Sequence, residues 1–181
     1  LNTYAATPER LQREGVGELF HELQQRGMDL AEQARDKAGK DVRIAGCLPP
    51  LFGSYKPELT LSFDETLAIY RRVVAEQKDR VDLILCETMA SAEGGLAAAT
   101  AAAESGLPIW VSWTLKDDAE TITLRSGETI AEAAKAIAHI KTEARLANCS
   151  TPEVMDAAIT HLVALGGAVG TYANGFTSVS K

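Results

Sequence analysis

The chain has 181 residues with 46% hydrophobic and 24% charged side chains, which is typical of one globular domain with a sizeable core. Its formal net charge is −7 and it contains no basic run, so we expect no nucleic-acid partner and no binding to an anionic membrane. No apolar run approaches the roughly 20 residues of a membrane span, and the first residues lack the pattern of a signal peptide.

Apolar segments and helical patterns alternate along the chain. Residues 1–6 are predicted to be the tail of a strand, and Pro8 begins a helix that continues to Ala38. Further strands are predicted at 42–46, 81–86, 109–114, 144–149 and 168–172. Further helices are predicted after Ser62 and at 93–104, 129–140 and 154–165.

Two helix starts and one loop carry local signals. Ser62 to Glu65 and Ser150 to Glu153 both have the form of a capping box, in which a serine and a glutamate satisfy each other's backbone groups. Residues 48–61 form a long loop with three prolines, Phe52 and Tyr55. Long loops in compact domains are often functional, so we expect this loop to close over a substrate.

The alternation of strands and helices implies a parallel sheet with right-handed crossovers. A closed eight-stranded barrel takes roughly 250 residues, which is more than this chain has. We therefore expect an α/β fold of the (β/α)8 TIM-barrel family, here an incomplete barrel that lacks the first and last strands. Residues 1–181 are expected to form a single, partial barrel domain.

Glu87 is the most informative single residue, because it ends a strand that is otherwise apolar and would face the mouth of a barrel. A carboxylate in that place can bind a substrate ammonium group or act as a base. The alternative is a surface glutamate at the end of a strand. The uniformly apolar segment before Glu87 favours the functional interpretation.

Cys149 lies at the end of another predicted strand, next to Asn148 and just before a helix. A thiolate is favoured near a helix N-terminus, so Cys149 is a candidate nucleophile or metal ligand. A nucleophilic cysteine needs a nearby histidine, but all three histidines fall in helical patterns that are expected on the outer surface: His21, His139 and His161. Metal ligation is therefore the more attractive role.

Other candidates carry weaker signals. The pair Asn174-Gly175 is explained equally well as a simple turn, and Thr3 is placed at the same edge of the sheet by the partial first strand. Free cysteines are usually buried, so Cys47 and Cys86 are expected to be core residues. Three scattered cysteines do not make a disulfide framework, which indicates a reducing compartment, the cytoplasm.

Taken in order, seven short segments of the chain resemble the homocysteine S-methyltransferase family, in particular its bacterial branch. Each segment is a weak signal alone, but the order and the spacing are specific. The segments are Asn2-Thr3-Tyr4-Ala5-Ala6-Thr7, Ala45-Gly46-Cys47-Leu48-Pro49-Pro50 with Gly53-Ser54-Tyr55, Cys86-Glu87-Thr88-Met89, Val111-Ser112-Trp113-Thr114, Leu124-Arg125-Ser126-Gly127-Glu128, Asn148-Cys149-Ser150 and Tyr172-Ala173-Asn174-Gly175.

The resemblance implies a barrel enzyme that transfers a methyl group from a small donor to the sulfur of homocysteine, forming methionine. It also implies a catalytic zinc ion held by three cysteine thiolates, which keeps the homocysteine sulfur as a thiolate. By this resemblance Cys149 is the first zinc ligand and Glu87 binds the amino group of homocysteine. Thr3, Asn148 and Asn174 match residues that line the family's pocket.

Two family features have no counterpart in this sequence: the adjacent cysteine pair that supplies the other zinc ligands, and the aspartate of the first strand. An inactive truncated form is therefore one alternative. A second is a barrel lyase that uses Glu87 as its base. A third is a non-catalytic fragment that self-associates through open sheet edges, giving a homo-oligomer. The sequence leaves the methyl donor open among S-methylmethionine, S-adenosylmethionine and betaine.

Overall fold

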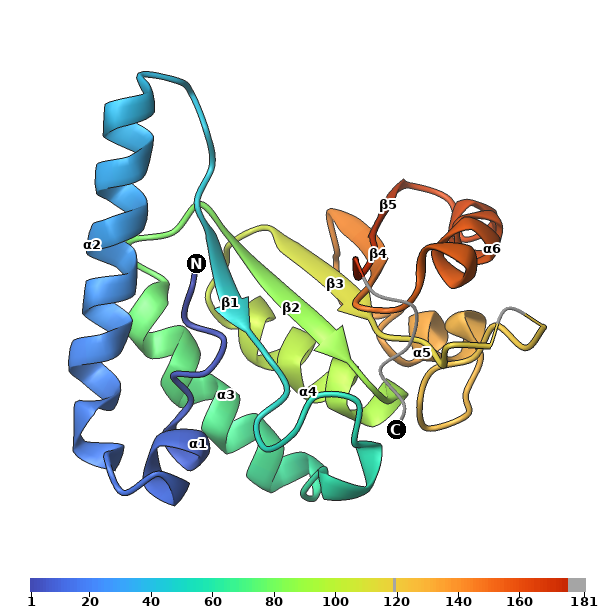
Figure 1. Cartoon of the computed structure of the whole chain (residues 1–181), viewed down its shortest axis with the longest axis horizontal. Helices are drawn as coiled ribbons and strands as arrows, with labels where there is room; N and C mark the ends of the chain where they lie inside the picture. The colour runs from blue at the N-terminus through green and yellow to red at the C-terminus, as the bar shows by residue number, and fades with distance from the viewer. Residues whose placement is uncertain (119, 176–181) are drawn as a thin grey trace.

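The computed structural model describes residues 1–118 and 120–175 of the chain. Five parallel strands form one sheet in the order β1-β2-β3-β4-β5, so each strand pairs with the next one in the sequence (Figure 1). The strands are β1 Ala45–Leu48, β2 Leu83–Met89, β3 Ile109–Trp113, β4 Ala144–Asn148 and β5 Ala168–Tyr172. This arrangement confirms the predicted α/β class and is consistent with part of a barrel wall.

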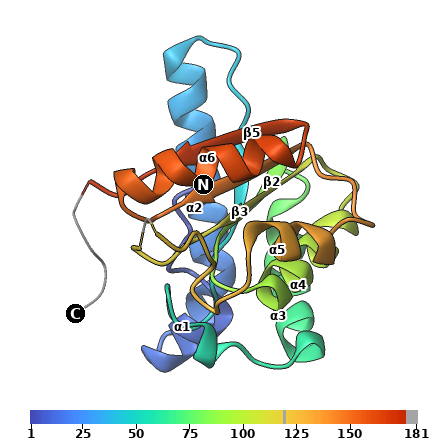
Figure 2. The same ribbon diagram turned by 90° about the vertical axis from the view of Figure 1, so that its right-hand side faces the viewer.

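The helices connect the strands and lie along one side of the sheet (Figures 1 and 2). Helix α4 packs on β2 and β3, and α6 packs on β4 and β5. The helices are α1 Pro8–Arg13, α2 Phe20–Ala38, α3 Phe63–Gln77, α4 Ala92–Ala103, α5 Ile130–Ala136 and α6 Pro152–Ala164, with short 3-10 turns at Gly17–Leu19 and Pro57–Leu59. None of the helices in the described part of the chain combines the length and the apolar content needed to cross a bilayer.

The N-terminal part departs from the prediction in two ways. Residues 1–6 are not a strand; instead, the amino group of Leu1 donates a 2.6 Å hydrogen bond to the carbonyl of Ala45, which places this segment beside β1. The single predicted helix up to Ala38 is divided into α1 and α2. Gly15, at φ 74°, takes a left-handed conformation that glycine adopts without strain, and this ends the first helical segment.

One of the two predicted capping boxes is present. Ser62 and Glu65 satisfy each other's backbone groups at the start of α3. The box predicted at Ser150 is wrong, because the N-cap of α6 is Thr151 and the Ser150 hydroxyl is bound elsewhere. That hydroxyl accepts a hydrogen bond from the backbone N–H of Leu115 and donates one to its carbonyl, both at 2.9 Å.

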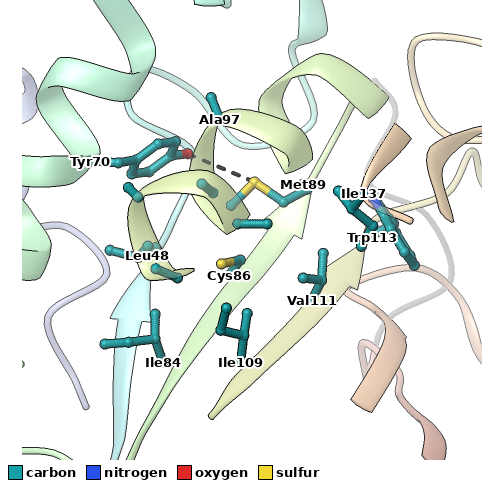
Figure 3. Close-up of a cluster of buried hydrophobic side chains, with 14 of the residues drawn as sticks. Leu48, Tyr70, Ile84, Cys86, Met89, Ala97, Ile109, Val111, Trp113 and Ile137 are labelled. Atoms are coloured by element: carbon teal, nitrogen blue, oxygen red, sulfur yellow. Dashed lines mark hydrogen bonds between the residues drawn. The ribbon is translucent and has the colours of Figure 1, made fainter. Parts of the chain in front are cut away.

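The main core lies between helices α3 and α4 and the face of the sheet that they cover, here called the outer face (Figure 3). Alanine-rich α4 brings its backbone close to the sheet, and a Cβ on Gly95 would come within 3.0 Å of the Trp113 ring nitrogen. Trp113 is fully buried there. Cys86 is also fully buried in this core, and its burial raises the pKa of its thiol.

A buried amide network joins the N-terminal segment, α2, α3 and β1. Gln77 accepts a 2.9 Å hydrogen bond from the backbone N–H of Cys47 and donates to the Cys47 carbonyl and to Gln24. Gln24 in turn donates to the carbonyl of Ala6 at 2.7 Å. Both glutamines are fully buried, so every bond in this network replaces a lost bond to water.

We therefore expect Gln77→Ala to leave the Cys47 backbone N–H buried and unpaired. An unpaired buried group costs about 1–3 kcal/mol, so the free energy of unfolding should fall by at least about that amount in chemical denaturation. The matched control is Gln33→Ala on the exposed face of α2, which should change it by no more than about 0.5 kcal/mol. An equal effect of both variants would contradict the role of the network.

Candidate active site

The face of the sheet opposite the helices, here called the inner face, carries one polar residue from each strand. They are Cys47 from β1, Glu87 from β2, Ser112 from β3, Asn148 from β4 and Tyr172 from β5. The Cys47 thiol contacts Glu87, the Ser112 hydroxyl contacts Asn148, and the Tyr172 hydroxyl lies near enough to Ser112, Glu87 and Cys47 for each to influence its pKa. Barrel enzymes keep their reactive groups at these C-terminal strand ends.

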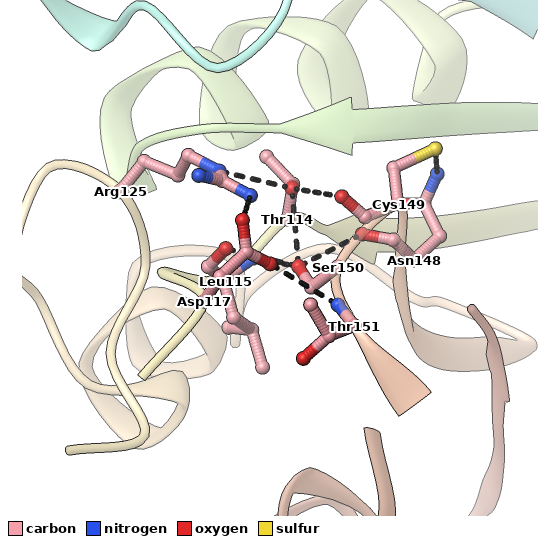
Figure 4. A network of polar contacts seen from close by, with 8 residues as sticks. All are labelled: Thr114, Leu115, Asp117, Arg125, Asn148, Cys149, Ser150 and Thr151. Carbon is pink, nitrogen blue, oxygen red and sulfur yellow. Dashed lines mark hydrogen bonds and ion pairs between the residues drawn. The ribbon is translucent and has the colours of Figure 1, made fainter. Parts of the chain in front are cut away.

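The side-chain amide of Asn148 is the centre of this cluster and is fully buried. Its oxygen accepts hydrogen bonds from the Thr88 backbone N–H at 3.0 Å and from the Ser112 hydroxyl at 2.7 Å. Its nitrogen donates to the Thr88 hydroxyl at 2.8 Å and to the Cys149 sulfur at 3.1 Å (Figure 4). One amide thus links β2, β3 and β4 and also orients the thiol.

Cys149 is half-buried directly after β4, and its backbone is left-handed with φ 56°. Its N–H donates to the Tyr172 carbonyl at 3.1 Å, and its carbonyl accepts a 3.2 Å bond from the Thr114 hydroxyl. Thr88, whose hydroxyl lies 3.7 Å from the Cys149 sulfur, is also left-handed with φ 61°. Non-glycine residues in this conformation are strained and cluster at functional sites.

A buried ion pair supports the backbone around Cys149 (Figure 4). Arg125 lies 3.1 Å from Asp117, with 10% and 5% of the two side chains exposed. Asp117 accepts a hydrogen bond from the backbone N–H of Thr151, and Arg125 donates to the Thr114 hydroxyl. The pair therefore fixes the loop after β3 to the start of α6.

The loop between β1 and α3 reaches the same place through Tyr55. The guanidinium of Arg125 lies over the Tyr55 ring, 4.6 Å from its centre, in a cation–π contact. Burial, and then the nearby Cys149 thiol, raise the pKa of the Tyr55 hydroxyl. Whether this loop closes further over a substrate stays a prediction.

Glu87 is half-buried within β2, two residues before the end of the strand rather than at its end as predicted. The Cys47 thiol donates a hydrogen bond of 2.9 Å to its carboxylate. Burial and the charge of Glu87 raise the pKa of Cys47 well above its usual value, so Cys47 is a neutral thiol at neutral pH. Cys47 is buried as expected, but it belongs to the polar inner face and not to the main core.

The remaining predicted pocket residues flank this cluster. Thr3 is buried beside α2, where its methyl group packs on Gly27, and its hydroxyl has no hydrogen-bond partner. Asn174 lies just after β5, where its backbone N–H donates to the Ser150 carbonyl, and its side-chain nitrogen is also buried without a partner. Buried polar groups are normally paired, so both side chains have bonding capacity left for water or a ligand.

The side chains that were expected outside the site do lie elsewhere. The three histidines are exposed, and His21 bonds Glu76 on the outer surface. A Cys–His nucleophile therefore has no support, which leaves the metal-ligand interpretation of Cys149.

The described residues do not by themselves form a metal centre. No group of three or more histidine, cysteine, aspartate or glutamate side chains is arranged for metal binding within residues 1–118 and 120–175. A protein zinc site uses three or four such donors, and Cys149 supplies one. The described residues therefore supply only one of the donors that a zinc site needs.

Several contributors to the site were not singled out from the sequence. Thr88, Ser112 and Tyr55 stand inside the family-like segments, but nothing in their identity indicates a left-handed backbone or an amide partner. The ion pair of Arg125 with Asp117 joins residues of one polar loop, and a charged loop is usually just solvated. Only the three-dimensional arrangement distinguishes these residues from surface positions.

We expect Asn148→Ala to destabilise the protein and to free the Cys149 thiol. The change leaves the Thr88 N–H and the Ser112 hydroxyl buried without their acceptor, at about 1–3 kcal/mol for each group left unpaired. Chemical denaturation measures the loss, with exposed Asn2→Ala as the control. A free energy of unfolding that stays within about 0.5 kcal/mol of the wild type would contradict the central role of this amide.

Alkylation near neutral pH should distinguish the three thiols. Cys149 is partly exposed, whereas Cys47 and Cys86 are 2% and 0% exposed and have raised pKa values. Because the thiolate is the reactive form, mass spectrometry should find iodoacetamide first on Cys149, and Cys149→Ser should remove the fast phase. Equally fast labelling of either buried cysteine would show that the described packing is wrong.

Comparison with solved structures gives the homocysteine methyltransferase MmuM from Escherichia coli in three forms. The metallated form has 23% sequence identity and a TM-score of 0.81, and the oxidized form has 21% and 0.82; each match covers 97% of this chain and 74% of the other. The apo form has 21% identity and a TM-score of 0.69, with 87% and 69% covered. At these identities the likeness shows a shared fold.

Comparison with curated protein sequences found no match. The family model described as homocysteine S-methyltransferase matches residues 1–181, the whole length of the sequence. This match agrees with the family-like segments noted above. The chain belongs to the homocysteine S-methyltransferase family.

Proposed function

We propose that this protein transfers a methyl group from a small donor to the thiol of homocysteine, forming methionine. Family membership supports the reaction, and one observation carries the assignment to this site. A half-exposed thiol, Cys149, is held on a strained backbone by a buried amide at the end of β4, and a carboxylate stands on the same inner face. Residues 1–181 are taken as one homocysteine-binding domain of a (β/α)8 barrel.

In this proposal Glu87 binds the ammonium group of homocysteine. Its carboxylate is half-buried, so an ion pair formed there is screened less than one on an open surface. The unpaired Thr3 hydroxyl and Asn174 amide nitrogen would line the pocket and bond substrate atoms or water. Asn148 acts through its neighbours, because all its polar atoms are already bonded to protein groups.

We further propose that Cys149 is one thiolate ligand of a zinc ion. Its sulfur is accessible and soft, which suits zinc. Since the described residues do not complete a donor set, the other ligands would come from a second copy of the chain or from the homocysteine sulfur. When bound, zinc lowers the pKa of a coordinated thiol and keeps it as a nucleophilic thiolate.

The remaining expectations concern the lyase alternative, the compartment and self-association. The lyase alternative needs Glu87 as a base, but its carboxylate already accepts a hydrogen bond from Cys47, and nothing else in the cluster favours that reaction. Three free thiols suit a reducing compartment, and we propose the cytoplasm. Self-association through the open edges of the sheet is tested by light scattering, in which a clean monomer would contradict it.

The decisive test is methionine formation from homocysteine with S-methylmethionine, S-adenosylmethionine and betaine offered separately. We expect one donor to support turnover, with Cys149→Ser lowering the rate at least about 100-fold, as loss of a ligand or charged partner does. Glu87→Gln should raise KM for homocysteine about tenfold, because a hydrogen bond to a charged group is worth roughly 1.5–3 kcal/mol.

Zinc per chain should be measured on the same samples, with and without homocysteine. Near-stoichiometric zinc that is lost in Cys149→Ser would support the ligand assignment, and exposed His161→Gln is the matched control that should keep both zinc and activity. No methionine with any donor, from a folded protein, would contradict the proposed reaction. Turnover without zinc would contradict only the metal assignment.

A further inference from the structure

Cys47 and Glu87 form a buried pair on adjacent strands. Cys47 pairs with Leu85 in the parallel register of β1 and β2, and Glu87 is two residues further along β2. Since side chains alternate along a strand, Leu85 and Glu87 point to the same face as Cys47. The thiol sulfur lies 2.9 Å from one carboxylate oxygen of Glu87, which is short for a sulfur donor.

The backbone that carries the Cys47 thiol is held in place by hydrogen bonds to Gln77. The backbone N–H and carbonyl of Cys47 are both bonded to the buried amide of Gln77. A Cβ on the preceding Gly46 would come within 2.6 Å of that amide oxygen, so the strand and the helix are in close contact here. Cys47 is therefore a rigid donor, while Glu87 is half-exposed and has a longer, more flexible side chain.

The chemistry of the two groups sets the direction of the bond. An ionised carboxylate only accepts hydrogen bonds, so the thiol is the donor. The donor occupies one of about four lone-pair sites on the carboxylate. The second oxygen is left for an ammonium group arriving from the open side of the inner face.

We propose that Cys47 is a positioning residue for substrate binding: its thiol holds the Glu87 carboxylate in the rotamer that receives the ammonium group of homocysteine. This inference rests on the proposed function, because it names Glu87 as the ammonium site. Cys47 itself does not touch the substrate or the methyl group. Its removal would leave Glu87 free to turn toward water and would weaken binding without changing the reacting atoms.

A plain packing role for Cys47 makes a different prediction from a positioning role. Serine and alanine are both small and fill the space of the thiol about equally, but only serine keeps a donor. If packing alone matters, Cys47→Ser and Cys47→Ala should affect the protein alike. If the hydrogen bond matters, serine should rescue what alanine loses.

The test is homocysteine binding measured by titration calorimetry, which needs neither a methyl donor nor turnover. We expect Cys47→Ala to raise the Kd about tenfold, equivalent to about 1.4 kcal/mol, and Cys47→Ser to stay within about twofold of the wild type. Cys86→Ala is the matched control, since this other buried cysteine faces the main core and its loss should leave Kd unchanged. Equal Kd values for the serine and alanine variants would overturn the proposal.

The S–H stretching band gives a second, independent readout on the wild-type protein. The band that disappears in Cys47→Ser should move to higher frequency in Glu87→Gln, because an amide is a weaker acceptor than a carboxylate. An unmoved band would overturn the pairing, and a wild type that does not bind homocysteine would overturn the assignment of Glu87. Binding with serine rescue but without methionine formation would support this inference while contradicting the proposed function.

Discussion

The site depends on one buried amide. Asn148 occupies all of its polar atoms with Thr88, Ser112 and Cys149, and so joins three adjacent strands at the level where their side chains leave the sheet. A buried amide is tolerated only when its bonding capacity is met. This requirement fixes the position of Thr88 in β2 relative to Cys149 after β4, and with it the direction of the Cys149 thiol.

The larger features of the fold could be predicted because they follow from periodicity. The five strands appear where apolar runs end at small polar clusters, and the alternation with helices yields a parallel sheet in sequence order. Glu87 and Cys149 were singled out by the same argument, since groups at the C-terminal ends of parallel strands meet at one edge. Asn148, Thr3 and Asn174 depended on resemblance to a family, and their environments are visible only in the structure.

The misses have physical causes that single residues illustrate. Gly15 interrupts an otherwise continuous helical pattern, because a left-handed residue ends a helix whatever the periodicity around it. Ser150 has the sequence of a cap, but a tertiary partner, the Leu115 backbone, competes successfully for its hydroxyl. Cys47 is buried as free cysteines usually are, yet burial alone does not say which face of the sheet a side chain occupies.

The left-handed backbones at Tyr55, Thr88 and Cys149 have a thermodynamic consequence. Each costs about 1–2 kcal/mol relative to a relaxed conformation, so together they cost roughly 3–6 kcal/mol, a large part of the 5–15 kcal/mol that typically keeps a domain folded. Directed evolution for heat resistance would therefore favour glycine at these three positions. At Cys149 this change would remove the thiol, and at Tyr55 and Thr88 it would remove side chains beside it, so thermostability and the proposed site oppose each other in this protein.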